Sequence, residues 1–261
     1  MLKPWLAAFS RTSPLLPAKK RLGLAVGSAV LCAGTAIAGA PGAALAATAD
    51  QAPTQSVAQS AGQQEAEPLT YGLDVSNYQP DFDWNTSPAQ FGIIKATEGL
   101  TFTDKSFARH WQRLGKKGIV RGAYHFAHPD DDPVAEAKHF LAVVNSQPAK
   151  PGDLLVLDLE TTDGESVSHV NAWAKTWLAY VKQQTGITPM FYSSWNFANR
   201  YGAGLEQYPL WVADYNGARG QISAPANWKT WTIHQYTDSP IDQNVSTLSV
   251  AQLRSLGRKT A

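Results

Sequence analysis

The most restrictive feature of the sequence is an apolar run, Leu154 to Leu157, that ends in Asp158-Leu159-Glu160. Four consecutive apolar residues before an acid–apolar–acid alternation predict a strand that is buried on both faces. Such strands occur in parallel sheets that are covered by helices, so this run favours the α/β class. It also raises a question, because a buried strand has no structural need for two carboxylates at its end.

From residue 69 onward, strand signals alternate with helix signals. The expected strands are residues 71–76, 91–99, 120–128, 154–160, 190–194, 210–215, 231–238 and a very short one at 242–245. The expected helices with visible signals are residues 105–117, 133–145, 168–185 and 195–200. Alternation of this kind predicts a parallel sheet with covering helices, and eight strands suggest that the sheet closes into a barrel.

Residues 69–261 form a short chain for a β/α barrel, which typically needs ~250 residues. Between residues 215 and 230 the chain has Gly217, Gly220, Pro225 and no helical period. We therefore predict an α/β fold of one domain, a reduced TIM-like β/α barrel with eight strands and about five helices, whose last strands are joined by loops. An open doubly wound sheet is the competing architecture, but no Gly-rich phosphate loop supports it.

The first 46 residues predict a secretory signal peptide. A basic stretch ends at Arg21, an apolar run follows it, and Ala44-Leu45-Ala46 fits cleavage before Ala47. A membrane anchor is the alternative, because the apolar run is just long enough to span a bilayer. Residues 47–68 are polar and contain no aromatic residue, so they predict a disordered linker. The expected location is extracellular or at the cell wall.

Charge is distributed unevenly along the chain. Residues 1–46 hold five of the 22 Lys and Arg residues and none of the 21 Asp and Glu residues, which leaves 17 basic against 21 acidic residues in the remainder. No basic surface for nucleic acid is expected. The only cysteine, Cys32, lies in the predicted signal peptide, so the mature chain depends on its core and not on disulfides. We expect a monomer that has no membrane association after signal cleavage.

In a β/α barrel the active site lies at the C-terminal ends of the strands. The expected ends carry Asp74, Glu98, His125, Asp158, Glu160, Tyr192, Asp214 and Gln235. Because residues i and i+2 of a strand face the same side, Asp158 and Glu160 should both point into the mouth of the barrel. This placement answers the question raised by the buried strand.

Two neighbouring carboxyl groups repel each other when both are ionised, so one of them can retain a proton near neutral pH. A protonated acid beside an ionised partner is what cleavage of a glycosidic bond requires. For the pair Asp158 and Glu160 alone, a solvated loop edge or a salt-bridged pair is the simpler interpretation. Asp74 and Asp214 at other strand ends favour the catalytic interpretation, because four acids would then converge.

The ordered motifs GLDVSNYQ, IIKATEG, GAYHFA, LDLE, FYSS, WVADY and HQY resemble a glycoside hydrolase family 25 lysozyme, an N-acetylmuramidase. The resemblance covers about residues 70–250. It implies a reduced β/α barrel and hydrolysis of the β-1,4 bond between N-acetylmuramic acid and N-acetylglucosamine, with peptidoglycan glycan strands as the partner. It implies no metal and no organic cofactor.

The same resemblance implies roles for individual residues. Glu160 matches the family's general acid/base, and Asp158 matches its companion carboxylate. Two further acids of the family's site are matched by Asp74 and Asp214. The predicted substrate-binding residues are Tyr124, Tyr192 and Gln235.

Two rival functions remain open in the sequence. A chitinase-like glycosidase would use a similar strand end, but residues 152–160 lack its longer Asp-rich signature. A non-catalytic wall-binding barrel would lack the acid, whereas Glu160 is present.

Some histidines and tryptophans also allow two interpretations. His125 and His128 would need a third ligand to bind a metal, and a hydrogen-bonded role beside the site is the preferred interpretation. Trp84, Trp195 and Trp231 lie near predicted loops or strand ends, where they could contact sugar rings or pack in the core.

Overall fold

The computed structural model describes residues 68–260. The predicted signal peptide and linker lie outside this range, apart from Pro68. The strands are β1 (Thr70–Val75), β2 (Phe91–Glu98), β3 (Phe102–Thr103), β4 (Val120–Phe126), β5 (Leu154–Asp158), β6 (Met190–Ser194), β7 (Leu210–Ala213), β8 (Ile233–Thr237) and β9 (Gln243–Ser246). The helices are α1 (Phe107–Lys117), α2 (Pro133–Asn145), α3 (Val167–Thr185), α4 (Trp195–Tyr201) and α5 (Val250–Leu256).

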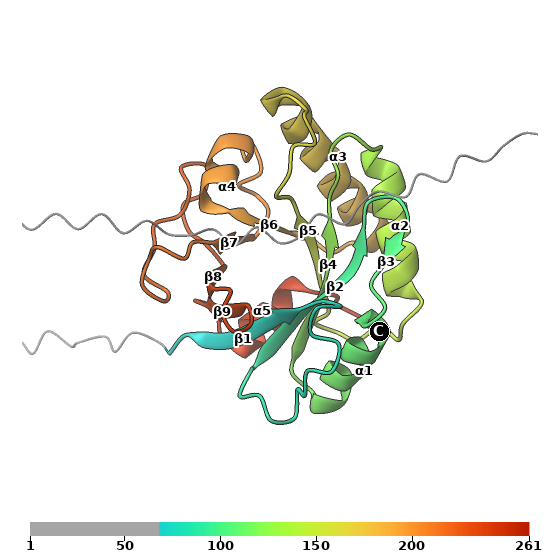
Figure 1. The fold of residues 1–261 in the computed structure, drawn as a ribbon, viewed down its shortest axis with the longest axis vertical. Coiled ribbons are helices and arrows are strands. Elements are labelled where there is room, and N and C mark those ends of the chain that lie inside the picture. The colour runs from blue at the N-terminus through green and yellow to red at the C-terminus, as the bar shows by residue number, and fades with distance from the viewer. Residues whose placement is uncertain (1–67, 261) are drawn as a thin grey trace, which may run out of the picture. The chain divides into compact units, whose positions relative to one another are not determined.

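Eight of these strands close into a barrel (Figure 1). The order around the barrel is β1-β2-β4-β5-β6-β7-β8-β9, and β9 pairs with β1 to complete the ring. The two-residue strand β3 pairs only with β2 and lies outside the ring. The predicted reduced barrel with eight strands and five helices is therefore confirmed for the residues that the structure describes.

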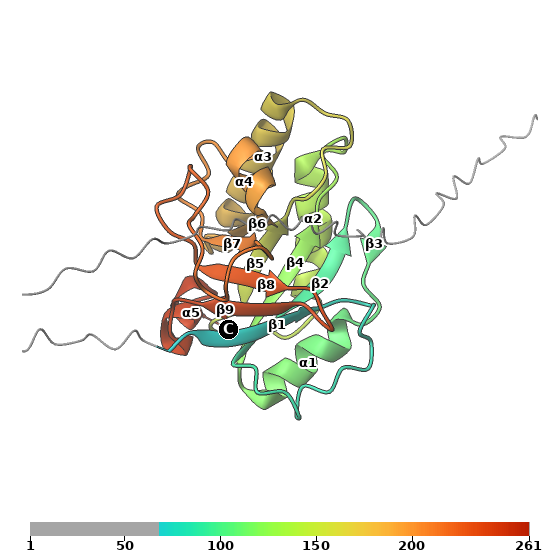
Figure 2. The same ribbon diagram turned by 60° about the vertical axis from the view of Figure 1, so that its left-hand side comes forward.

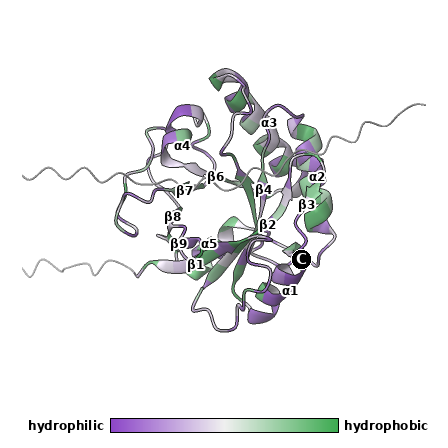
Figure 3. Ribbon diagram, viewed as in Figure 1, coloured by the Kyte–Doolittle hydropathy of each residue, from purple (hydrophilic) through white to green (hydrophobic). Residues whose placement is uncertain are grey.

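Side chains of each barrel strand alternate between two apolar layers. Leu154 and Val156 of β5 belong to the cluster inside the barrel, whereas Leu155 and Leu157 pack in the layer between the sheet and the helices. Burial on both faces explains the unbroken apolar run of this strand. Figure 3 shows mixed apolar and polar residues on α2 and α3, as expected of helices that have one face on the sheet and one in solvent.

Helix ends follow local signals in the sequence. Helix α2 begins at Pro133 after Asp132, whose carboxylate accepts a hydrogen bond from the backbone N–H of Ala135. Helix α3 ends at Gly186, which adopts φ 69°, a left-handed conformation that favours glycine. Both helices were predicted to within one residue of their observed bounds.

The C-terminal part of the barrel has few helices, as predicted. Strands β7 and β8 are joined by a loop, and β8, β9 and β1 lie side by side with no helix drawn over them (Figure 2). One expectation was wrong, because β9 runs antiparallel to both β8 and β1. A short connection from β8 allows only this direction, since a parallel neighbour requires a longer crossover.

Helix α5 follows β9 and is not one of the four helices that were expected from the sequence by residue range. Its Leu253 packs into the interior cluster beside Phe91, Val120 and Leu154, which lie at or near the N-terminal ends of their strands. The helix thus closes the N-terminal end of the barrel and leaves the C-terminal end as the open mouth. Among residues 68–260, no helix combines the length and apolarity that a membrane span requires.

Candidate active site

A pocket of about 260 Å³ opens at the mouth of the barrel. Its lining residues are Asp74, Tyr124, Asp158, Glu160, Tyr192, Trp211, Tyr215, Gln235, Asp238 and Asp242. Half of these ten residues are acidic, and none is basic. Such a pocket repels anions and favours groups that donate protons or hydrogen bonds.

The pair Asp158 and Glu160 lies in this pocket because of the alternation in β5. Leu159 is fully buried in the layer under the helices, so the residues on either side of it face the barrel mouth. Asp158 is only 5% exposed, whereas Glu160 is an exposed residue at the rim. One carboxyl group therefore lies at the floor of the pocket and the other lies beside solvent.

Electrostatics favour a shared proton on this pair. Burial raises the pKa of Asp158 well above its usual range, and the charge of Glu160 raises it further. The pKa of Glu160 is also raised, because surrounding protein atoms displace water from its carboxyl group although the residue lies at the rim. Two carboxyl groups in these surroundings lose their protons in two separate steps, so the pair holds one proton over an intermediate pH range.

One oxygen of Asp158 has an unusual environment. Its Oδ1 atom is buried and accepts no hydrogen bond from any residue that the structure describes. A buried acceptor without a donor is costly, because it has lost water and gained no partner. Protonation of Asp158 would lower this cost by removing the buried charge, and a donor group on a bound ligand would remove it.

Asp74 is held in place by a network of amides and phenols. Its Oδ2 atom accepts hydrogen bonds from Gln235 Nε2 at 2.9 Å and from Asn244 Nδ2 at 2.6 Å. Gln235 Oε1 in turn accepts from the hydroxyls of Tyr192 at 2.9 Å and Tyr215 at 2.6 Å. Burial raises the pKa of Asp74 to about 6, although the two amide donors oppose this shift.

Six of the seven predicted site residues line the pocket, and Asp214 does not. Strand β7 ends at Ala213, and the carboxylate of Asp214 accepts a hydrogen bond from the backbone N–H of Asn216 at 3.0 Å. This local turn occupies the side chain that was expected to face the mouth. A catalytic role for Asp214 stays a prediction, and so do the roles of the other six.

Sequence reasoning missed four residues of the pocket, namely Trp211, Tyr215, Asp238 and Asp242. Asp242 immediately precedes β9, and it reaches the mouth because that strand runs antiparallel. In an all-parallel barrel, only acids at the C-terminal ends of strands would face the mouth, and an acid before an antiparallel strand breaks this rule. Asp238 did carry a usable signal, because it stands at the end of the expected strand 231–238.

Burial raises the pKa of Asp242 from the ordinary 3.8 to about 8, and the charge of Asp74 adds to this shift. Asp242 therefore stays protonated in the folded protein at pH values where the unfolded chain has ionised. Its contribution to the free energy of unfolding falls as the pH rises from about 4 to about 8 and is constant above that range.

We expect Asp242→Asn to remove this pH dependence, because the amide does not titrate. The melting temperature of the variant, relative to that of the parent, should rise between pH 4 and pH 8 in calorimetric scans. Glu206→Gln, a loss of one exposed carboxylate between α4 and β7, is the control and should show no such trend. A difference between Asp242→Asn and the parent that is the same at every pH would contradict the prediction.

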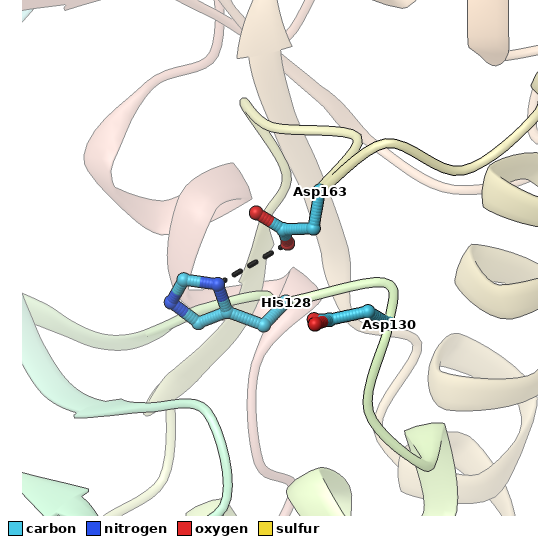
Figure 4. A group of neighbouring side chains, drawn as sticks. All are labelled: His128, Asp130 and Asp163. Carbon is cyan, nitrogen blue, oxygen red and sulfur yellow. Dashed lines mark hydrogen bonds and ion pairs between the residues drawn. The ribbon is translucent and has the colours of Figure 1, made fainter. Parts of the chain in front are cut away.

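A chain of ion pairs lies beside the pocket. Lys95 Nζ contacts Glu98 Oε2 at 2.6 Å, and Glu98 Oε1 contacts His128 Nε2 at 3.2 Å. The other ring nitrogen of His128 lies 3.2 Å from Asp163, whose carboxylate faces the ring in Figure 4. Hydrogen bonding to Glu98 raises the pKa of His128 to about 9. Lys95 connects this chain to the acid pair, because its charge lowers the pKa of both Asp158 and Glu160.

His128, Asp130 and Asp163 bring potential metal-ligating atoms within 4.8 Å of one another (Figure 4). A metal ion would have to displace the proton of an imidazolium that two carboxylates already stabilise. This competition favours the ion pair over a metal. His125 points elsewhere, since its ring nitrogens contact Thr97 at 2.8 Å and Glu136 at 2.6 Å in the core.

A closed β/α barrel with a pair of carboxyl groups at its mouth has the architecture of a glycoside hydrolase. The sequence profile of glycosyl hydrolases family 25 matches residues 73–245. The chain belongs to this family and is a glycoside hydrolase of the lysozyme type.

Curated relatives include proteins with and without an assigned activity. Uncharacterized protein YegX of Escherichia coli strain K12 is 34% identical over 71% of this chain and 72% of its own length. The N,O-diacetylmuramidase of Arthroderma benhamiae is 32% identical over 64% of this chain and 77% of its own length. Lysozyme M1 of Streptomyces globisporus is 29% identical over 73% of this chain and 72% of its own length.

The fold superposes on solved structures of lysozymes. A family 25 lysozyme from Aspergillus fumigatus superposes with a TM-score of 0.66 at 30% identity, over 73% of this chain and all of that one. A bacterial lysozyme from Streptomyces coelicolor superposes with a TM-score of 0.67 at 28% identity, over 75% of this chain and 100% of that one.

Proposed function

We propose that the protein is a muramidase that hydrolyses the β-1,4 bond between N-acetylmuramic acid and N-acetylglucosamine in bacterial peptidoglycan. The observation that carries the proposal is the acidic pocket that holds Asp158 and Glu160 together, where burial raises the pKa of both carboxyl groups. The names of the relatives, lysozyme and N,O-diacetylmuramidase, supply the substrate class.

Glu160 acts as general acid and then as general base. It stands at the rim, where a glycosidic oxygen can approach, and its raised pKa keeps a proton available. Protonation of the leaving oxygen accompanies breakage of the bond between that oxygen and the anomeric carbon. The ionised Glu160 then removes a proton from the water that attacks the same carbon.

Asp158 orients the substrate's own 2-acetamido group, which is the nucleophile. Its unpartnered Oδ1 atom accepts a hydrogen bond from the acetamido N–H, while the acetamido oxygen bonds to the anomeric carbon and gives a cyclised intermediate. A hydrogen bond to the ionised form lowers the pKa of a carboxyl group, so substrate binding moves the shared proton from Asp158 to Glu160. Direct attack by Asp158 is the competing mechanism.

A zymogram with purified peptidoglycan and with chitin, followed by reducing-end analysis, tests the substrate. We expect cleavage of peptidoglycan with N-acetylmuramic acid at the new reducing ends. Cleavage of chitin at a comparable rate would favour a chitinase-like enzyme. Binding to peptidoglycan without any new reducing end would favour a non-catalytic wall-binding barrel.

We also propose that the enzyme is exported and acts as a monomer outside the cell or at the cell wall. The basic stretch before an apolar run and the Ala44-Leu45-Ala46 site support cleavage before Ala47. N-terminal sequencing of the exported protein should begin near Ala47. Recovery of the intact chain from Met1 in a membrane fraction would favour an anchor instead.

A further inference from the structure

Large apolar side chains that are exposed gather at one end of the barrel. Among residues 68–260 they are Tyr78, Leu100, Phe102, Val167 and Tyr215. Each follows the C-terminal end of a barrel strand, namely β1, β2, β5 or β7, so all five surround the mouth that holds the acidic pocket. Three of the five are aromatic, and an exposed aromatic ring beside a polar pocket offers a flat apolar face to a ligand.

The order of the strands around the barrel shows on which side of the mouth each of these residues lies. Strands β2 and β7 are four places apart in a ring of eight, so they lie on opposite sides of the mouth. Phe102 therefore lies across the mouth from Tyr215. A line between them has β5, with Asp158 and Glu160, on one side and β1, with Asp74, on the other.

Contacts within the structure place the aromatic residues on the β2–β3 side and on the β7 side of the mouth. The backbone N–H of Asn77 donates to Asp104 at 2.7 Å, which fixes the loop of Tyr78 beside the segment that follows β3. Lys95 Nζ lies 5.5 Å from the ring centroid of Phe102. At the other end, Tyr215 lines the pocket and is 48% exposed.

We propose that Tyr78, Phe102 and Tyr215 form a sugar-binding track that holds a glycan strand across the mouth, from the β2–β3 hairpin to the loop after β7. This inference rests on the proposed function and adds the direction of the substrate. A sugar ring has an apolar face that stacks on an aromatic ring and a hydroxyl edge that stays in water. On this course the scissile bond crosses between Glu160 and Asp74.

The small size of the pocket supports such a track. Its volume of about 260 Å³ is below the roughly 300–1,000 Å³ of pockets that enclose a drug-sized ligand. A polymer of amino sugars must therefore continue over the rim on both sides. Two of the three tryptophans considered from the sequence are unsuitable for this contact, because Trp84 and Trp231 are buried.

Kinetics on long and short substrates test the track. On polymeric peptidoglycan, we expect Tyr78→Ala and Phe102→Ala each to lower kcat/KM about tenfold, through KM, because each loses one stacking contact. On an aryl glycoside of the disaccharide repeat, which reaches only the pocket, both variants should stay within about twofold of the parent. Tyr215→Phe keeps the ring and loses the hydroxyl, so any further loss in Tyr215→Ala measures the ring.

Val167→Ala is the matched control, because Val167 is as exposed as Phe102 but follows β5, away from the line of the track. It should retain the parent's kcat/KM on the polymer. The track is wrong if Tyr78→Ala and Phe102→Ala match Val167→Ala on the polymer.

A second measurement does not depend on turnover. It compares the affinity of Glu160→Gln for polymeric peptidoglycan with that of double variants that also carry Tyr78→Ala or Phe102→Ala. A parent that cleaves no peptidoglycan overturns the proposed function. In that case an unchanged affinity of the alanine variants overturns the track as well, whereas an affinity about tenfold lower supports it as a glycan-binding surface.

Discussion

Glu160→Gln should lose roughly 10²–10⁴ of the rate of peptidoglycan hydrolysis, because the amide keeps the shape of the side chain but cannot donate the required proton. The residue is exposed at the rim and forms no salt bridge among the described residues, so the melting temperature should stay close to that of the parent. Binding of glycan strands should also persist. Release of new reducing ends over time is the measurement.

Glu206→Gln makes the same chemical change at an exposed site away from the mouth and should retain full activity. If Glu160→Gln cleaves peptidoglycan within a few-fold of the parent, Glu160 is not the acid. A large loss in both variants would instead point to a general effect of charge on binding to the cell wall.

A stable analogue of the cyclised intermediate should inhibit the enzyme strongly if Asp158 orients the acetamido group. Since the buried Oδ1 atom of Asp158 lacks a donor, we expect it to orient the acetamido group and not to attack. A thiazoline analogue of the cyclised sugar should then bind 10²-fold or more tighter than substrate, as transition-state analogues commonly do. Inhibition constants of the parent enzyme provide the measurement.

A 2-fluoro sugar with a good leaving group distinguishes the two mechanisms. It should leave the protein unlabelled if the acetamido group is the nucleophile. A peptide that carries the fluoro sugar on Asp158, detected by mass spectrometry, would establish direct attack instead. Label on Asp74 or Asp214 would move the nucleophile away from β5 altogether. Product stereochemistry does not separate the two mechanisms, since both retain the anomeric configuration.

Features that depend only on neighbouring residues were predicted correctly from the sequence. The two-residue period of a strand placed Asp158 and Glu160 on the side opposite Leu159, and the structure has this arrangement. Gly186 marked the end of α3, because a left-handed residue is needed there. Glycines and a proline after residue 215 correctly predicted a loop in place of a barrel helix.

Strand ends were less predictable, because a terminal side chain can form a local turn instead of extending the strand. Asp214 was expected to face the mouth, but its carboxylate accepts from Asn216 and lies outside the pocket lining. Glu98 was also expected at the C-terminal end of a strand. The structure places it between Lys95 and His128, and these neighbours lower its pKa to about 2.

The sequence alone determined the class of fold, the positions of most strands and helices, and the face of β5 that carries the acid pair, because each depends on residues close in the chain. Only the tertiary structure decided the direction of β9, which brings Asp242 to the mouth, because strand direction depends on pairing with β1 and β8. It also decided the amide network that connects Asp74 to Gln235, residues 161 positions apart in the chain. Closure of the barrel creates that contact, and no local pattern in the sequence encodes it.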